Sequence, residues 1–367
     1  MKKHLRVSMI AFAAVLPFVA LAAAEPPVQK ISAASKAVRD AIDLKAADGC
    51  KHIYGFNYQP SWGHNGLTVW GEKFDPKRYR EELEVGKKYF PEFNTVRIWL
   101  SWSSYRENPE RFIRNFQQAM DICGELDLLV IPVMFNRWIS STLWERVVNP
   151  EIVADFDATF VPFVRSLVAS HKGDLRILAW DLCNEPFIQG ADNKKVPVSW
   201  ERETQWLGDI RNAAKQCDPN ALVCIGVYPS MRCLNSTAHL QDILTTHLYY
   251  PLYKSHPKSV LESLKNSGVR DDLIKNSFEA AVKLGKPMMS TECCWGSEND
   301  AERVSIIRTN LQALRRYKIA FFPHALWTSG VADLHRSPNY TQGWYMPFIL
   351  EDGSLRPGHE VYNEFTR

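Results

Sequence analysis

The feature that most constrains the fold is an alternation of short apolar runs with helical segments over most of the 367 residues. Eight runs have the length and composition of β-strands, beginning at His52, Asn94, Leu128, Leu175, Leu222, Ile243, Pro287 and Ile319. The segments between most runs have apolar residues at helical spacing, and parallel strands need such crossovers. The alternation predicts an α/β fold, a single (β/α)8 (TIM) barrel.

Helix starts support this prediction. Asp75-Pro76, Asn108-Pro109 and Asn149-Pro150 each place a good N-cap before proline at the first helical position. The competing architecture, a doubly wound open sheet, would need a glycine-rich phosphate turn after its first strand. No G-x-G-x-x-G or P-loop motif is present, which favours the barrel.

The chain begins with the pattern of a secretory signal. A basic start precedes an apolar stretch from about Val7 to Leu21, and Ala22-Ala23-Ala24 offers a cleavage site. We therefore predict a signal peptide over 1–24, an N-terminal leader packed on the barrel over 25–50, and a catalytic domain over 51–367. The protein is expected to be secreted or periplasmic. The stretch contains Pro17 and lacks a charged stop-transfer flank, so a membrane anchor is disfavoured and none is expected after cleavage.

Charge and cysteine content narrow the class of protein. Removing the predicted signal takes away three of 44 basic and none of 41 acidic residues, which leaves a neutral chain. Nucleic-acid binding would favour a basic surface, so no nucleic-acid partner is predicted. The eight cysteines match no zinc or redox spacing; disulfides are permitted in an exported protein, but most are predicted to be small buried apolar residues. The oligomeric state stays open.

Two glutamates end predicted strands. Asn184-Glu185-Pro186 closes the fourth run, and Glu292 closes the seventh. A carboxylate at the end of a buried strand is costly without a partner or a function. Either one alone could simply pair with a cation at the barrel rim, but both would face the same cavity at the carboxyl ends of the strands. Cleavage of a glycosidic bond needs two such carboxyl groups.

With these motifs the chain resembles the clan A retaining glycoside hydrolases, closest in pattern to glycoside hydrolase family 5 (cellulase/mannanase-like), over about residues 50–330. The resemblance implies that Glu185 is the acid/base and Glu292 the nucleophile. Further residues that it places at the substrate are Asn184, Arg97, His247, Tyr249 and Trp327. Asn184 would donate to the sugar 2-hydroxyl, Arg97 would keep the nucleophile ionised, His247 and Tyr249 would line the −1 subsite, and Trp327 would form a platform on the last strand.

One position departs from the family pattern. The third strand is expected to end in histidine followed by asparagine, but Phe135 stands at the histidine position, before Asn136 and Arg137. A phenyl ring cannot hydrogen-bond a sugar hydroxyl, so we predict that Asn136 or Arg137 supplies this recognition or that the subsite differs. A neighbouring clan A family is the alternative.

The predicted function is a secreted retaining glycoside hydrolase that cleaves β-linked glycans of glucan, mannan or xylan type. No cofactor and no metal is predicted, because metal and nucleophile-elbow motifs are lacking, although a metal site assembled from scattered histidines stays open. The alternative is a non-catalytic or transglycosylating carbohydrate-binding barrel. Tryptophans near the predicted strand ends, which stack well on sugars, are Trp62, Trp70, Trp102, Trp138, Trp144 and Trp295.

Overall fold

A computed structural model describes residues 31–63, 65–137, 159–187, 198–249, 271–329 and 345–366. The predicted signal peptide, the predicted helix start at Asn149-Pro150, and Trp138 and Trp144 lie outside the described residues.

All eight predicted strands are present, and each pairs in parallel with its neighbour in the chain wherever a ladder forms. Their bounds are β1 Gly55–Tyr58, β2 Thr95–Trp99, β3 Leu129–Asn136, β4 Trp180–Asn184, β5 Val223–Cys224, β6 Leu244–His247, β7 Met288–Cys293 and β8 Ala320–Pro323. This order, in which each strand follows its neighbour in parallel and the first is bridged to the last, identifies the (β/α)8 barrel.

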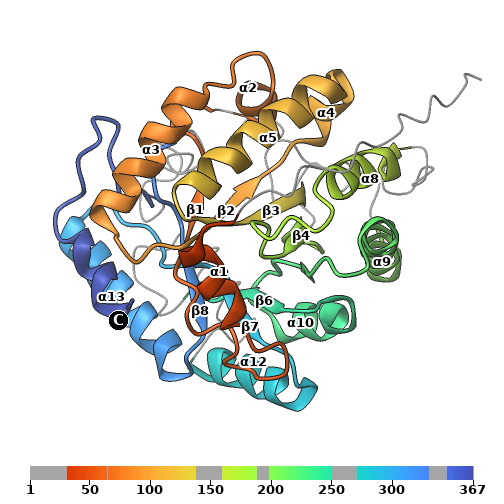
Figure 1. Cartoon of the computed structure of the whole chain (residues 1–367). Helices are drawn as coiled ribbons and strands as arrows, with labels where there is room; N and C mark the ends of the chain where they lie inside the picture. Colours follow the sequence, from red (N-terminus) through yellow and green to blue (C-terminus); the bar gives the residue numbers. More distant parts are fainter. Residues whose placement is uncertain are drawn as a thin grey trace, which may run out of the picture.

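Regular ladders divide the strands into two groups, β1 to β5 and β6 to β8. Two isolated parallel bridges join the groups: Tyr54 with Phe321 between β1 and β8, and Val227 with Thr246 between β5 and β6. Figure 1 shows the strands at the centre and the helices around them. We call these two junctions the seams of the barrel.

The helices follow the predicted pattern. The described ones are α1 Ala33–Asp40, α2 Gly66–Trp70, α3 Pro76–Tyr89, α4 Trp102–Glu107, α5 Pro109–Glu125, α8 Val161–Ser170, α9 Trp200–Cys217, α10 Met231–Thr237, α12 Asp271–Leu284 and α13 Asp300–Arg316, with 3-10 turns η2 Ala238–Leu240 and η4 His359–Phe365. Asp75 caps α3 by accepting from the Arg78 N–H, and Asn108 caps α5 by accepting from the Arg111 N–H. Each cap satisfies a backbone donor that the first helical turn leaves free.

The leader helix α1 closes one end of the barrel. Val38 and Ile42 pack against the apolar layer inside the strands, which includes Leu129 and Leu178. Arg39 donates to the backbone carbonyls of Leu175 and Ile177, which precede β4. Because α1 covers the ends where the strands begin (Figure 1), the opposite, carboxyl ends are left for a site.

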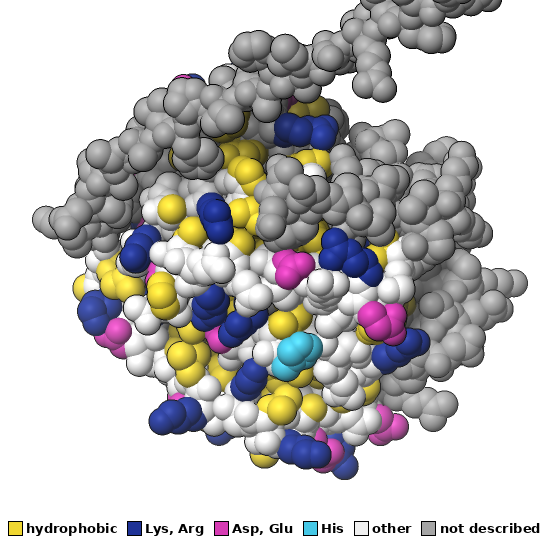
Figure 2. Space-filling model, turned by 90° about the vertical axis from the view of Figure 1, so that its right-hand side faces the viewer, with side chains coloured by type: hydrophobic (Ala, Val, Ile, Leu, Met, Phe, Trp, Pro, Cys, Tyr) yellow, Lys and Arg dark blue, Asp and Glu magenta, His cyan; other side chains and the backbone are white. Residues whose placement is uncertain are grey.

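The cysteines and the surface fit an ordinary globular chain. All eight cysteines lie in the described residues as free thiols, seven buried and Cys217 half-buried, so the expectation of small buried residues is confirmed. On the face shown in Figure 2, Lys and Arg are interspersed with Asp and Glu. Within the described ranges, we find no helix with the length and apolar character needed to cross a membrane.

Candidate active site

The two glutamates come from opposite groups of strands. Glu185 follows the last residue of β4, and its N–H donates to the carbonyl of Gly226 at 2.7 Å. Its φ of 48° lies in the left-handed region, where a residue with a side chain is strained. Glu292 lies in β7. Both are only 6% exposed, so each carboxyl group depends on protein partners or a bound ligand.

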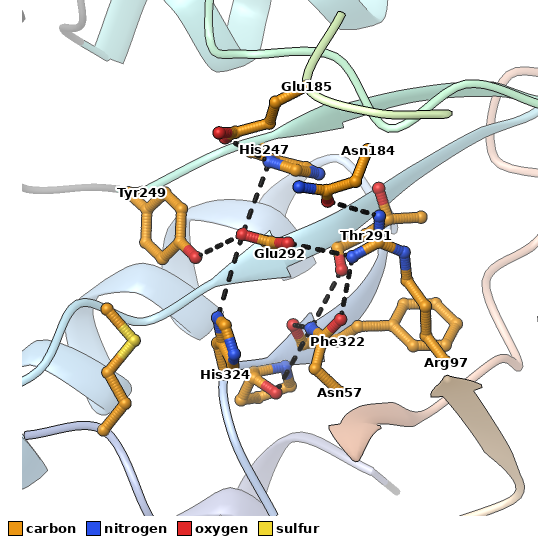
Figure 3. A network of polar contacts seen from close by, with 12 residues as sticks. Asn57, Arg97, Asn184, Glu185, His247, Tyr249, Thr291, Glu292, Phe322 and His324 are labelled. Carbon is orange, nitrogen blue, oxygen red and sulfur yellow. Dashed lines mark hydrogen bonds and ion pairs between the residues drawn. The ribbon is translucent and has the colours of Figure 1, made fainter. Parts of the chain in front are cut away.

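His247 stands between the two carboxyl groups. Its Nδ1 lies 2.7 Å from Oε1 of Glu185 and 3.4 Å from Oε2 of Glu292. Tyr249, two residues further on, donates its hydroxyl to Oε2 of Glu292 at 2.7 Å. The end of β6 therefore contacts both glutamates, as Figure 3 shows.

Arg97 on β2 is fully buried and holds the other oxygen of Glu292. Its Nη1 donates to Oε1 of Glu292 at 2.9 Å and to Oδ1 of Asn57 at 3.0 Å. Its Nε and Nη2 both donate to Oδ2 of Asp181, at 3.0 and 2.8 Å, and Nη2 also reaches Oδ1 of Asn184 at 2.7 Å. Such multiple charge-assisted bonds fix both the arginine and the carboxylates that it contacts.

The pKa values of the glutamates move in opposite directions. Burial by itself would raise the pKa of Glu292, but His247, His324 and Arg97 and the Tyr249 hydrogen bond outweigh it and lower that pKa to about 2. Burial raises the pKa of Glu185, and the nearby Glu292 adds to this, although the hydrogen bond from His247 and its charge oppose it. One carboxyl group is thus held ionised and the other is favoured to stay protonated.

Two amides complete one side of the cluster. Asn184 donates from Nδ2 to Oδ1 of Asn136, the last residue of β3, at 3.0 Å. Asn136 is half-buried and lies opposite Asn184 in the β3–β4 ladder. The structure therefore brings together seven predicted residues, namely Arg97, Asn136, Asn184, Glu185, His247, Tyr249 and Glu292.

Trp327 is not brought to this cluster, and its prediction as a sugar platform is wrong. Its Nε1 donates to the carbonyl of Glu82 in α3 at 2.8 Å, and the side chain packs in the core that surrounds the strands. The last strand ends at Pro323, four residues before Trp327. The residue at the strand end is His324.

Phe135 and Arg137 also have structural rather than sugar-facing contacts. The Phe135 ring packs edge-on against Phe160 and Phe163 in the helix layer, so it faces away from the cluster. That Asn136 or Arg137 supplies the recognition expected of the missing histidine stays a prediction. Arg137 is buried and pairs with Glu203 on α9 at 2.8 Å. Asn136 is the residue of β3 that contacts the cluster, through its hydrogen bond with Asn184.

Three residues of the cluster were missed in the sequence: Asn57, Asp181 and His324. Asn57 ends the first predicted strand and donates to the carbonyls of Thr291 and Phe322, at 2.9 and 2.8 Å. Asp181 is a buried acid inside an otherwise apolar run, a signal that could have identified it. Pro323 could have indicated that the eighth strand stops before His324.

The tryptophans named from the sequence have mixed surroundings. Trp70 is buried and donates to the carbonyl of Trp99, and Trp102 donates to that of Thr159. Trp295 meets Tyr249 edge-on, with ring centroids 5.2 Å apart. Of these, Trp295 is the one whose contacts join it to the glutamate cluster.

Glu185, His247 and Glu292 could also be read as a metal site, because one ligand atom of each lies within 4.8 Å of the others. Both oxygens of Glu292, however, already accept hydrogen bonds from protein donors, Arg97 and Tyr249. Coordination would displace this hydrogen bonding, so the donor set fits a carboxylate pair better than a cation. That no metal is needed stays a prediction.

A buried pair of glutamates at the carboxyl ends of β4 and β7, one ionised and one favoured to be protonated, defines the glycosidase class of barrel enzymes. The family model described as "Cellulase (glycosyl hydrolase family 5)" matches residues 64–331. The chain belongs to glycosyl hydrolase family 5 and is an O-glycosyl hydrolase. No curated protein matches its sequence.

Solved structures of similar fold are distant in sequence. The exo-β-1,4-mannosidase Op5Man5 from Opitutaceae bacterium strain TAV5 is 19% identical with a TM-score of 0.64, over 86% of this chain and 59% of that one. The GH5_18 protein from Streptomyces cattleya in complex with GlcNAc is 16% identical with a TM-score of 0.66, over 89% and 80%. The endo-1,4-β-mannanase from Rhizomucor miehei is 15% identical with a TM-score of 0.61, over 83% and 93%. This chain spans less than two thirds of the mannosidase.

Proposed function

We propose that this enzyme is an exported retaining β-glycosidase that cleaves β-linked glycans in two displacement steps. The observation that carries the proposal is the spacing of the pair: one oxygen of Glu185 and one of Glu292 lie within 4.8 Å of each other. Retaining glycosidases hold their carboxyl groups about 5–5.5 Å apart, whereas inverting enzymes leave room for a water between them.

In the first step Glu292 attacks the anomeric carbon while Glu185 gives its proton to the departing oxygen. The low pKa of Glu292 supports its role as the anion, and the raised pKa of Glu185 supports its role as the acid. In the second step Glu185 removes a proton from water, which cleaves the glycosyl–Glu292 ester and restores both groups. A sugar acceptor in place of water would give transglycosylation.

The glycan is proposed to be of mannan, glucan or xylan type. Mannosides come first in a substrate panel because three solved structures of similar fold are named as a mannosidase or mannanases. Export, with cleavage after Ala24, is proposed from the basic and apolar start of the chain.

Azide rescue tests the two roles. Glu292→Ala should nearly abolish turnover, and azide entering the vacated space should give a glycosyl azide of inverted configuration. Glu185→Ala should still form the glycosyl-enzyme from an activated aryl glycoside, and azide should then give the retained configuration. NMR of the products distinguishes the anomers.

The control is Glu84→Gln, a conservative change at an exposed residue of α3. This variant should be as active as the wild type and, like the wild type, should not respond to azide. The same azide anomer from both active-site variants, or full activity in either, would contradict the assignment.

A further inference from the structure

His324 follows Pro323, the last residue of β8, and lies beside the proposed nucleophile (Figure 3). Its Nδ1 is 3.8 Å from Oε2 of Glu292, and its side chain is 12% exposed. The ring stacks on that of Trp99, with centroids 5.7 Å apart and planes at 22°. Stacking on a buried indole fixes the plane of the imidazole beside the glutamate, and Nδ1 is the ring nitrogen on the Glu292 side.

The imidazole has no hydrogen bond in the described part of the chain. The 3.8 Å gap to Glu292 is too long for one, and Nε2 is buried without a partner. An imidazole N–H beside a buried carboxylate but too far from it to donate is costly, so an oxygen of a ligand that reaches Nδ1 would be stabilised there. The 3.8 Å separation leaves positions where one oxygen atom is about 2.8 Å from both Nδ1 and Oε2 of Glu292.

The protonation state of His324 suits a hydrogen-bond donor rather than a cation. Burial lowers its pKa to about 4, and Arg97 and His247 act in the same direction against the opposing charge of Glu292. The ring is therefore neutral near pH 6–7. Its single proton is favoured on Nδ1, the nitrogen that faces the carboxylate.

We propose that His324 donates through Nδ1 to a hydroxyl group of the sugar bound against Glu292, and so determines which sugars the enzyme accepts. This inference rests on the proposed glycosidase function and adds a specificity residue to it. A substrate without that hydroxyl would leave Nδ1 unpaired beside Glu292, a loss that a hydrogen-bonding site penalises.

A matched pair of variants tests the proposal. His324→Asn keeps an N–H donor near the place of Nδ1, whereas His324→Leu has a similar branched shape without a donor. Each is assayed on the aryl β-glycoside that the wild type cleaves best and on its 2-, 3-, 4- and 6-deoxy analogues. His239→Asn, at an exposed histidine of η2, is the control.

We expect His324→Leu to lower kcat/KM on the parent glycoside by about ten- to a hundredfold, and His324→Asn to lose clearly less. For one deoxy analogue, His324→Leu and the wild type should agree within about twofold, because the partner hydroxyl is already gone. That analogue identifies the hydroxyl. Equal losses on every substrate, or an asparagine variant no better than leucine, would overturn the proposal.

Two checks keep the outcomes separate. If His324→Leu does not fold, His324→Gln replaces it, since its amide reaches the place of Nε2 and leaves no donor at the place of Nδ1. If the wild type cleaves no glycoside of the panel, the proposed function has failed. If the wild type is active and azide rescue gives the expected anomers, equal losses of kcat/KM on every substrate contradict only the role proposed for His324. The proposed glycosidase function then stands.

Discussion

Arg97 shows how one residue organises this site. Its guanidinium is fully buried and bonds two carboxylates, Asp181 and Glu292. Burial disfavours its charge, but these two acids more than compensate and raise the pKa of Arg97. A planar fork is needed to reach both acids at once, which a lysine ammonium cannot do. Arg97 therefore both orients Glu292 and keeps it ionised.

The opposite pKa shifts of the glutamates predict a bell-shaped dependence of kcat/KM on pH. As pH falls, activity is lost only when Glu292 gains a proton, well below the usual carboxyl range because its pKa is lowered to about 2. As pH rises, activity is lost when Glu185 gives up its proton, above its ordinary pKa because burial raises it. Rate measurements on an aryl glycoside over pH 2–9 check both limbs.

The variant Glu185→Gln assigns the basic limb. With a good leaving group that needs no acid, this limb should disappear from the rate of the first step. A basic limb that persists unchanged would mean that another group supplies the proton.

Sequence reasoning at this scale succeeded where the residue type itself carries the chemistry. Glu185 and Glu292 were identified because a buried carboxylate at a strand end needs a partner or a function, and Arg97 was identified from the family resemblance. The structure places the three together. Trp327 was misplaced because an apolar run continues past Pro323, and composition does not show where a ladder stops. The sequence left open whether Asn136 or Arg137 faces the site, because the direction of a side chain depends on the parity of the strand, which one register step reverses.

Among the elements, β5 is the shortest strand of the barrel, Val223–Cys224, and its continuation carries Gly226. A Cβ at Gly226 would lie 2.7 Å from Nη2 of Arg97, 2.9 Å from Oδ2 of Asp181 and 2.9 Å from Nε2 of His247. The Gly226 N–H also donates to Oδ1 of Asp181 at 3.0 Å. The absence of a side chain here lets three buried polar groups meet.

We therefore expect Gly226→Ala to lower kcat/KM by roughly a hundredfold, since it displaces Arg97 and His247 and with them both glutamates. Overpacking should also destabilise the fold by about 1–3 kcal/mol. Gly208→Ala in α9 is the control: its nearest neighbour would be Leu240 at 3.9 Å, and alanine favours a helix. Kinetics and denaturant unfolding of both variants check this, and an active Gly226→Ala enzyme would contradict it.

Element positions were predictable where local chemistry marks them. The Asp75 and Asn108 caps follow from the sequence, because capping is a local property. The role of Gly226 was not predictable. Its constraint comes from side chains of β2, β4 and β6, which only the closed barrel brings together.

For the whole molecule, the alternation of eight strands and helices was sufficient to predict the barrel. It could not predict the division of the strands at two seams, because the alternation does not show how many residues of neighbouring strands pair. The free thiols fit the same packing: all the cysteines but Cys217 are buried, where each is a small apolar side chain.

Because the two glutamates lie on different sides of a seam, a bound substrate is expected to stabilise the pairing of strands at that seam. Glu185 belongs to the first group of strands and Glu292 to the second. A sugar that is bound covalently to Glu292 and contacts Glu185 therefore connects the two groups across the seam between β5 and β6. There the His247 N–H donates to the Val227 carbonyl at 3.0 Å. With a 2-fluoro glycosyl-enzyme trapped, amide hydrogen exchange should slow at this bond and far less in the β2–β3 ladder. Equal slowing of exchange at the β5–β6 seam and in the β2–β3 ladder would show that the two open together, and that the seam is no less stable than the ladder.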